Sequence, residues 1–538
     1  MRKLIFTFIY LFIAYSAFSQ GYFSGEFQSN FNVFIKDTTI GVQGAHYDNL
    51  KSGTDNWFTL NYNNTKYDLE ASVRMDFFYN SILHTPSTPF TGFGLGRVHI
   101  QKKIKDFTIK AGYIYDQFGS GVAFRSYEER SLGIDNAVIG AKVDYNYKNK
   151  LKVKAFAGVQ KYRFTVYKPI LKGINVEGDL AIKDKVFFAP GVSFFNRTLD
   201  KESMDVTVKV IESYDYAKRF VPKYNVYVMS AYNTLRYKGL SWYVEGAYKT
   251  KDAIKNQYDT LVNTDGNYVY TSLNYSQKGF GITAQFKRTE NFTLRTSQSE
   301  TFLRGMLNFI PPTARQNSLR LPARYFAPSL ELRELAFGAE ATITLAKNVN
   351  ITLNYSEIRD FILKKTNNPH PLYFREAFAE VIMKPTKKME LDFGMQYVRY
   401  NKTQYRQEPP ADVDAITPFF EMTYKFDRKK SIRTELQYQY VPKDYGQWVY
   451  LLLEFNIAPK WSFAVSDMWL AKVNLDEHPQ LKSQAARHYY SAFVGFTHHA
   501  NRFTLSYVRQ VEGIVCTGGV CRLEPAFNGV RLGITSTF

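Results

Sequence analysis

The chain has 538 residues with a formal net charge of +20, and 17% of them are aromatic, including 40 Tyr and 44 Phe. After the N-terminus, no segment approaches eighteen uninterrupted apolar residues, which excludes crossing of a membrane by internal helices. The aromatic content exceeds what a soluble core needs, and the mean hydropathy of −0.32 fits strands that are apolar on alternate residues. This composition favours a membrane β-barrel over a soluble exported protein.

Residues 1–19 have the pattern of a secretory signal peptide. Two basic residues precede an apolar run that ends at Ala14, and A-F-S at 17–19 forms a small-x-small cleavage site. The run is too short to span a membrane. A lipid anchor is not expected, because no Cys lies near the cleavage site. We expect residues 20–538 to form one domain. An exported chain rarely meets nucleic acid, so the basic charge does not predict a nucleic-acid partner.

Alternation with a period of two residues recurs along the chain, for example over 67–77, 334–345 and 432–440. Each run is close to the ~10 residues that a tilted strand needs to cross a bilayer, whereas strands of soluble sandwiches are usually ~5–6 residues long. The last eleven residues, 528–538, have one apolar and one polar face and end on Phe538. This end resembles the closing strand of bacterial outer-membrane barrels.

The connections fall into two classes. Eleven short turns are centred on Asn63–Lys66, Lys102–Lys105, Tyr147–Lys150, Leu199–Glu202, Tyr237–Gly239, Ser276–Lys278, Lys347–Asn348, Pro385–Lys387, Asp427–Lys429, Ala458–Lys460 and His499–Asn501. Between them lie twelve generally longer segments, including Lys36–Asn56, Gln117–Asp135, Lys161–Asp184, Lys251–Gly266, Asn291–Leu330 and Val473–Arg487.

This pattern predicts an all-β transmembrane antiparallel barrel of about 24 strands, within a range of 20–26, with short periplasmic turns and long extracellular loops. Both termini are expected on the periplasmic side. Most short turns carry Lys or Arg. These charges keep the turns soluble or contact anionic lipid headgroups, and either interpretation accounts for much of the net charge.

A barrel of this girth encloses a lumen wide enough for an aqueous channel. The predicted barrel begins close to the cleavage site, which leaves no room for an N-terminal plug of the kind found in TonB-dependent transporters. The longest loop, 291–330, is therefore the candidate constriction. It carries five arginines, a residue type suited to carboxylates, phosphates or sulfated sugars: Arg295, Arg304, Arg315, Arg320 and Arg324. The alternative is a lid over the barrel mouth, with arginines paired to lipopolysaccharide or barrel acids.

The second candidate loop, 117–135, contains Arg125, Glu128, Glu129 and Arg130. Mixed charge at this density is typical either of a pore-lining ion-pair network or of a solvated loop.

Cys516 and Cys521 enclose a Gly-Gly reversal, and the export route is oxidising, so a disulfide is expected. A metal site at these two cysteines is not expected, because no His or acidic residue lies near them at ligand spacing. The eight His are scattered, with neither H-E-x-x-H nor a nucleophile elbow, so no enzyme activity, cofactor or metal is expected.

Three stretches are similar to an uncharacterised family of large Bacteroidota outer-membrane proteins: F-G-S-G-V-A-F-R-S-Y-E-E-R at 118–130, G-V-S-F-F-N-R at 191–197, and R-Q with C-T-G-G-V-C-R before the closing strand. The resemblance implies a porin-like outer-membrane barrel without naming an activity.

We therefore expect a channel for hydrophilic solutes, anions among them. The alternative is a non-conducting scaffold that docks surface lipoproteins or secretion and assembly machinery. Outer-membrane lipid, lipopolysaccharide and other outer-membrane proteins are the expected partners.

Overall fold

The computed structural model describes residues 21–40, 42, 50–83, 88–182, 185–256, 258–298, 300, 304–360, 371–408, 412–482, 487–517 and 520–538. The predicted signal peptide, 1–19, lies outside the described residues.

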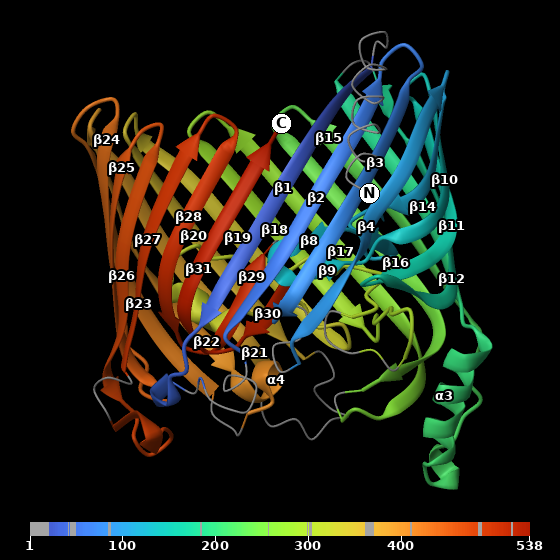
Figure 1. Ribbon diagram of the computed structural model, residues 1–538. Coiled ribbons are helices and arrows are strands. Elements are labelled where there is room, and N and C mark those ends of the chain that lie inside the picture. The colour runs from blue at the N-terminus through green and yellow to red at the C-terminus, as the bar shows by residue number, and fades with distance from the viewer. Residues whose placement is uncertain are drawn as a thin grey trace, which may run out of the picture.

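The described chain forms a closed antiparallel barrel of 24 strands, which confirms the predicted fold (Figure 1). Each strand pairs with the next, and β1 closes the ring by pairing with β31, Glu26 opposite Thr537.

The barrel strands are β1 (Gly21–Phe34), β2 (Ser52–Asn64), β3 (Leu69–Ser81), β4 (Phe90–Ile104), β5 (Phe107–Ile114), β10 (Val138–Tyr147), β11 (Leu151–Tyr162), β12 (Thr165–Gly178), β14 (Val186–Thr198), β15 (Asn225–Tyr237), β16 (Leu240–Lys255), β17 (Leu261–Gln277), β18 (Phe280–Glu290), β19 (Arg333–Ala346), β20 (Val349–Arg359), β21 (Leu372–Thr386), β22 (Met389–Asn401), β23 (Asp412–Lys425), β24 (Lys430–Gln439), β25 (Gly446–Ile457), β26 (Trp461–Val473), β27 (His488–His498), β28 (Asn501–Gln510) and β31 (Phe527–Thr537). The short strand β13 (Leu180–Ile182) continues the β12 edge of β14.

The connections carry β6 (Asp116–Phe118), β7 (Phe124–Ser126), β8 (Glu128–Glu129), β9 (Ile134–Asp135), β29 (Gly513–Thr517), β30 (Val520–Glu524), the helices α3 (Lys201–Glu212) and α4 (Lys402–Arg406), and the 3-10 turns η1 (Thr38–Ile40), η2 (Arg130–Leu132), η3 (Tyr216–Lys218), η4 (Pro322–Tyr325) and η5 (Pro479–Lys482). No helix among the described residues is long and apolar enough to cross a membrane.

Side chains alternate between the two faces of the wall. On β3, Val73, Phe77 and Tyr79 are exposed on the outside, while Arg74 and Asp76 are buried on the inside. The same alternation around the ring leaves many large apolar side chains exposed on the outer surface. A soluble monomer rarely exposes so much apolar surface, so this face is suited to lipid.

Eleven short connections gather at one rim of the barrel and twelve mostly longer ones at the other (Figure 1). We call these ends the short-turn rim and the long-connection rim. The C-terminus lies at the short-turn rim, where the amide of Gly25 donates to the Phe538 carbonyl at 2.8 Å.

Two predicted connections between β11 and β15 are wrong, although the strand count holds because the two errors cancel. Most of the predicted loop Lys161–Asp184 is the strand β12. Its outer face carries Lys168 and Lys172 beside Ile170, and these two lysines interrupt the apolar alternation by which a strand is recognised. The predicted turn Leu199–Glu202 is the start of α3, a long-rim connection.

Asp200 caps this helix by accepting from the amides of Glu202 and Ser203. The predicted loop Lys251–Gly266 also shortens to 256–260, because β16 and β17 extend into it.

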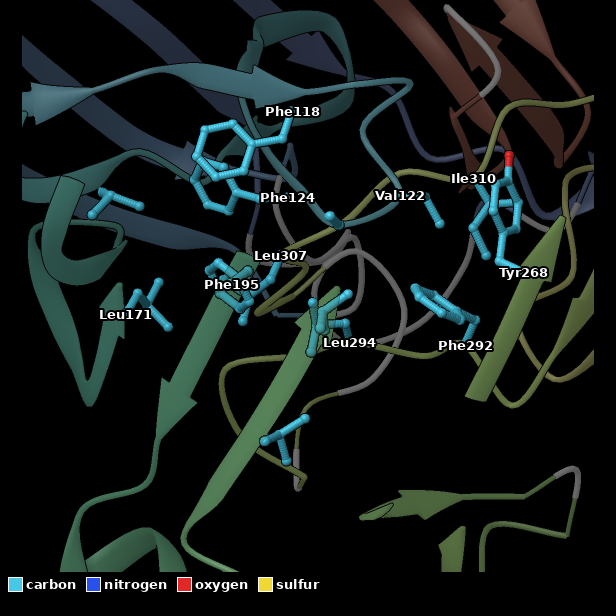
Figure 2. Packing of buried hydrophobic residues seen from close by; sticks show 14 of the residues in the cluster. Phe118, Val122, Phe124, Leu171, Phe195, Tyr268, Phe292, Leu294, Leu307 and Ile310 are labelled. Atoms are coloured by element: carbon cyan, nitrogen blue, oxygen red, sulfur yellow. The ribbon is translucent and has the colours of Figure 1, made fainter. Parts of the chain in front are cut away.

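The apolar core lies inside the barrel, in its long-connection half. One cluster joins inward side chains of the wall, such as Leu171 and Phe195, to Phe124, Phe292 and Leu307 of two connecting loops (Figure 2). Two further clusters pack the loop residues around Leu321 and Tyr325 against other sectors of the wall.

Candidate functional site

The β18–β19 connection, residues 291–332, lies within the lumen. The Gln160 side chain on β11 donates to the Met306 carbonyl at 2.7 Å. The amide of Leu321 donates to the Gln437 side chain on β24 at 2.7 Å. Because β11 and β24 belong to opposite sectors of the ring, this loop reaches from one wall to the other.

Lys287 on β18 holds both ends of the segment 311–329. Its ammonium donates to the Pro311 carbonyl at 2.6 Å and to the Ser329 hydroxyl at 2.8 Å. It also forms an ion pair with Glu334 at 2.8 Å, and both side chains are fully buried. Glu334 in turn accepts from the amide of Leu330 at 2.5 Å. This group ties the loop to the wall where the loop returns to β19.

The five loop arginines are distributed along the lumen and do not form one cluster. Arg295 pairs with Glu331 at 3.3 Å, beside the exit of the loop. Arg315 pairs with Glu340 on β19 at 3.0 Å and lies over the Phe378 ring at 3.9 Å. These two guanidinium groups therefore anchor the loop and are already neutralised.

Arg324 lies over the Trp448 ring at 4.2 Å, and Arg304 is exposed. Arg320 is also exposed. Among the described residues, neither Arg320 nor Arg324 has a carboxylate partner within ion-pair distance, so both guanidinium groups could meet a solute anion.

The β5–β10 connection, residues 115–137, also folds into the lumen. At its centre is Arg74 of β3, whose guanidinium bonds to Asp76 at 2.6 Å, to Asp135 at 3.0 Å and to Glu128. Lys161 of β11 completes the network through Asp135. Glu128 and Asp135 lie in the charged loop 117–135 that the sequence indicates, and the alternation over 67–77 predicts that Arg74 faces the lumen. No local signal predicts that these side chains meet, because they are far apart in the chain.

The other predicted residues of this loop have separate roles. Arg130 donates to Glu26 and Gln28 of β1 at 2.8 and 2.7 Å. Arg125 stacks on the Phe309 ring at 4.2 Å, which joins the two loops. Glu129 accepts from the Ser131 amide and caps η2.

Backbone hydrogen bonds also join these two loops. The amide of Arg125 donates to the Leu307 carbonyl at 2.8 Å, and the amide of Phe309 donates to the Gly121 carbonyl at 2.9 Å. The β29–β30 hairpin contacts η2 and forms a third inward segment. The three connections therefore make one body inside the barrel.

The hairpin register places Cys516 opposite Cys521. Facing residues in an antiparallel pair have Cα atoms about 4.5–5.5 Å apart, within the range of a disulfide. The cysteine side chains lie outside the described residues, so the disulfide stays a prediction.

The tip of the second loop rests on Glu245 of β16. The amide of Ser120 donates to this carboxylate at 3.1 Å, and the Tyr243 hydroxyl donates to it at 2.8 Å. Gly119 adopts a φ of +53°, and a Cβ there would lie 2.5 Å from Glu245 Oε1. Between this tip and the short-turn rim lies a recess of about 1120 Å³, lined by residues of the wall from β11 to β16.

Asp444, Glu477 and His478 are the described acidic and His side chains close enough to share a metal ion. The Asp444 carboxylate, however, accepts from Lys402 at 2.9 Å and from Tyr325 at 2.7 Å. Burial raises the pKa of Asp444, but these two hydrogen bonds and the lysine charge outweigh it and hold the pKa below its usual range. The group is therefore an anchor for η4 rather than an open metal site.

Comparison with solved structures finds large membrane barrels. The siderophore receptor PirA from Pseudomonas aeruginosa is 10% identical, with 96% of this chain and 80% of that chain covered and a TM-score of 0.42. The translocation pore of the P pilus usher PapC is 9% identical over 96% and 99%, with a TM-score of 0.38. OccAB4 of Acinetobacter baumannii is 8% identical over 82% and 98%, with a TM-score of 0.33. This likeness concerns the barrel fold.

No curated protein matches the chain. A family model does match, and it covers residues 1–538. The chain therefore belongs to DUF6029, a family of unknown function.

Proposed function

We propose that this protein is an outer-membrane channel for hydrophilic solutes, whose lumen is narrowed by the loops 115–137 and 291–332. The observation that carries the proposal is the anchoring of the second of these loops to both β11 and β24 across the lumen. A lipid-suited outer surface around a lumen with charged inward side chains supports a route for polar solutes. The proposal includes no catalytic activity.

The outer-membrane location rests on the barrel and on the asymmetry of its rims. Short turns typically face the periplasm in such barrels, which would place both termini there and the long connections outside. In this orientation lipid surrounds the wall, and lipopolysaccharide surrounds the long-connection rim.

The paired arginines limit the predicted preference for anions. Arg295 and Arg315 are neutralised by Glu331 and Glu340. A loop-based anion preference would rest on the other three arginines, so we propose a general route for hydrophilic solutes, anions among them.

A second candidate is a closed barrel that acts as a scaffold for surface lipoproteins or other outer-membrane proteins. The apolar clusters favour it, because they pack the inward loops on the wall as a protein core packs. Helix α3 projects beyond the long-connection rim, with Val206 and Val210 exposed, and offers a contact surface (Figure 1).

Single-channel conductance in planar bilayers separates the two candidates. The test compares the wild type with a deletion of Thr296–Pro328 and, as a control, with a replacement of Lys201–Glu212 by a short linker outside the lumen. Openings in the wild type that widen only in the loop deletion support the channel. A silent wild type with openings in the deletion supports the closed scaffold. Silence of all three folded proteins contradicts a channel.

A further inference from the structure

One sector of the lumen wall, near the short-turn rim, is rich in cations. The inward cationic side chains are Arg97 of β4, Lys110 of β5, Lys142 of β10, and Lys152 and Lys154 of β11. Two carboxylates pair with these lysines: Asp116 is 2.6 Å from Lys142 and 3.0 Å from Lys154, and Asp144 is 3.0 Å from Lys142. Two more carboxylates border the sector, Glu70 of β3 and Glu177 of β12, and Glu177 lies opposite Lys152 in the strand register. Among the described residues, Lys110 and Lys152 have no carboxylate within ion-pair distance. The sector keeps a positive excess.

A second sector is rich in carboxylates. Its inward acids are Glu380 of β21, Glu390 and Asp392 of β22, Glu421 of β23, Glu435 of β24 and Glu454 of β25. Arg433 lies among them, 2.8 Å from Glu421, 2.7 Å from Glu435 and 3.4 Å from Glu454. Lys384 pairs with Glu390 at 2.8 Å, and the loop residue Arg315 lies 3.7 Å from Glu380. The sector keeps a negative excess.

The ring topology places these two sectors opposite one another. In the closed order of 24 barrel strands, β22, β23 and β24 follow β5, β10 and β11 by twelve positions each. The charged side chains of both sectors lie within about eight residues of a short turn, so they occupy the same band of the wall.

The inward loops are anchored to this band by side chains of opposite charge. Asp116 of the β5–β10 loop binds the cationic sector, and Arg315 of the β18–β19 loop binds the anionic sector. Each anchor uses part of the charge of its sector. Lys110 and Lys152 on one side and Asp392 on the other remain available to a solute between them.

We infer that the lumen selects dipolar solutes, which carry an ammonium and a carboxylate group together, such as amino acids and short peptides. A dipolar solute can point its carboxylate at the cationic sector and its ammonium at the anionic sector. A solute with one charge is attracted by one sector and repelled by the other, and a neutral solute gains little from either. Low-dielectric walls strengthen this effect. The inference rests on the proposed channel and adds its substrate class.

The test measures efflux of radiolabelled serine, glycerate, serinamide and erythritol from proteoliposomes. These probes have similar size and are dipolar, anionic, cationic and neutral. At low ionic strength we expect wild-type efflux of serine to exceed that of each other probe by about threefold. The ratio should approach one at high salt, because screening shortens the reach of both sectors.

Two variants separate the sectors. Asp392→Asn with Glu421→Gln weakens the anionic sector and should make glycerate the fastest probe. Lys110→Gln with Lys152→Gln should instead favour serinamide. Lys172→Gln, on the exposed outer face of β12, is the control and should keep the preference for serine. Heat-modifiable migration in gels confirms that each barrel has folded.

Equal efflux of all four probes from the wild type at low salt would overturn the inference and leave the channel intact. An unchanged preference for serine in both pairs of variants would overturn it as well. No efflux of any probe would overturn the proposed channel, and the inference with it.

Discussion

Replacement of Lys287 by Met is expected to loosen the longest loop from the wall. The ammonium is fully buried, and it contacts the Pro311 carbonyl at 2.6 Å, the Ser329 hydroxyl at 2.8 Å and Glu334 at 2.8 Å. Met conserves most of the side-chain length but leaves Glu334 buried without a cation. Removal of one partner from a buried ion pair costs about 3–5 kcal/mol. We expect this loss in the free energy of unfolding.

Urea titration of the barrel in lipid vesicles, followed by tryptophan fluorescence, measures the loss. The matched control is the double variant Lys287→Met with Glu334→Leu, which removes both charges and keeps the volume. Replacing a whole buried pair by apolar residues is often close to neutral, so the double variant should regain about 2 kcal/mol or more over the single variant. The single variant Glu334→Leu completes the comparison. If the losses of the two single variants simply add in the double variant, the reasoning is refuted, because an unpaired buried charge would then not be the cause.

Three further predictions concern the other inward segments. Gly119→Ala should destabilise the barrel by at least about 1 kcal/mol, because a left-handed backbone disfavours a Cβ and the Glu245 carboxylate lies where the Cβ would be. The control, Gly246→Ala, has open space at the Cβ and should change the free energy of unfolding by less than about 0.5 kcal/mol in the same titration. Asp444 has a lowered pKa, so its stabilisation is complete above the ordinary carboxyl pKa of about 4 and is lost as the pH falls through the lower native value. Asp444→Asn should therefore be less stable than the wild type at neutral pH, with unfolding curves that converge in acid; a gap that persists in acid would contradict this. Peptide mapping without reductant should recover the two cysteines in one cross-linked peptide, and free thiols would rule out the disulfide.

Most of the barrel could be predicted from the sequence, because a membrane strand alternates apolar, lipid-facing residues with polar, lumen-facing ones. Runs such as 67–77 and 432–440 fall within or beside β3 and β24 as expected. The pattern failed at 165–178 and at 199–224, each for a physical reason. Outward lysines interrupt the apolar face of β12, and α3 is amphipathic with Met204 and Ile211 buried at helical spacing.

The sequence identified the two inward loops as candidates but did not identify their partners. The five arginines of 291–330 and the mixed charge of 117–135 made these loops candidates for the lumen, with a lid and a solvated loop as the alternatives. An ion pair such as Arg74 with Asp135, however, joins residues far apart in the chain. Only the ring order brings β11 and β24 to opposite sides of the lumen. For the same reason, the charge of each inward residue was readable from the sequence, whereas the separation into a cationic and an anionic sector was not.

The two halves of the lumen differ in what their walls require. In the long-connection half, inward wall residues such as Phe195 and Trp448 are apolar and buried by the loops. Burial of each large apolar side chain contributes about 1.5–3 kcal/mol, so withdrawal of a loop carrying Phe124, Phe292 and Leu307 would cost many times the thermal energy. The loops are thus part of the fold, not lids that swing out to open it. A solute that crosses this barrel must therefore pass between loops that stay packed on the wall. The polar edges of these loops then determine the width of the constriction.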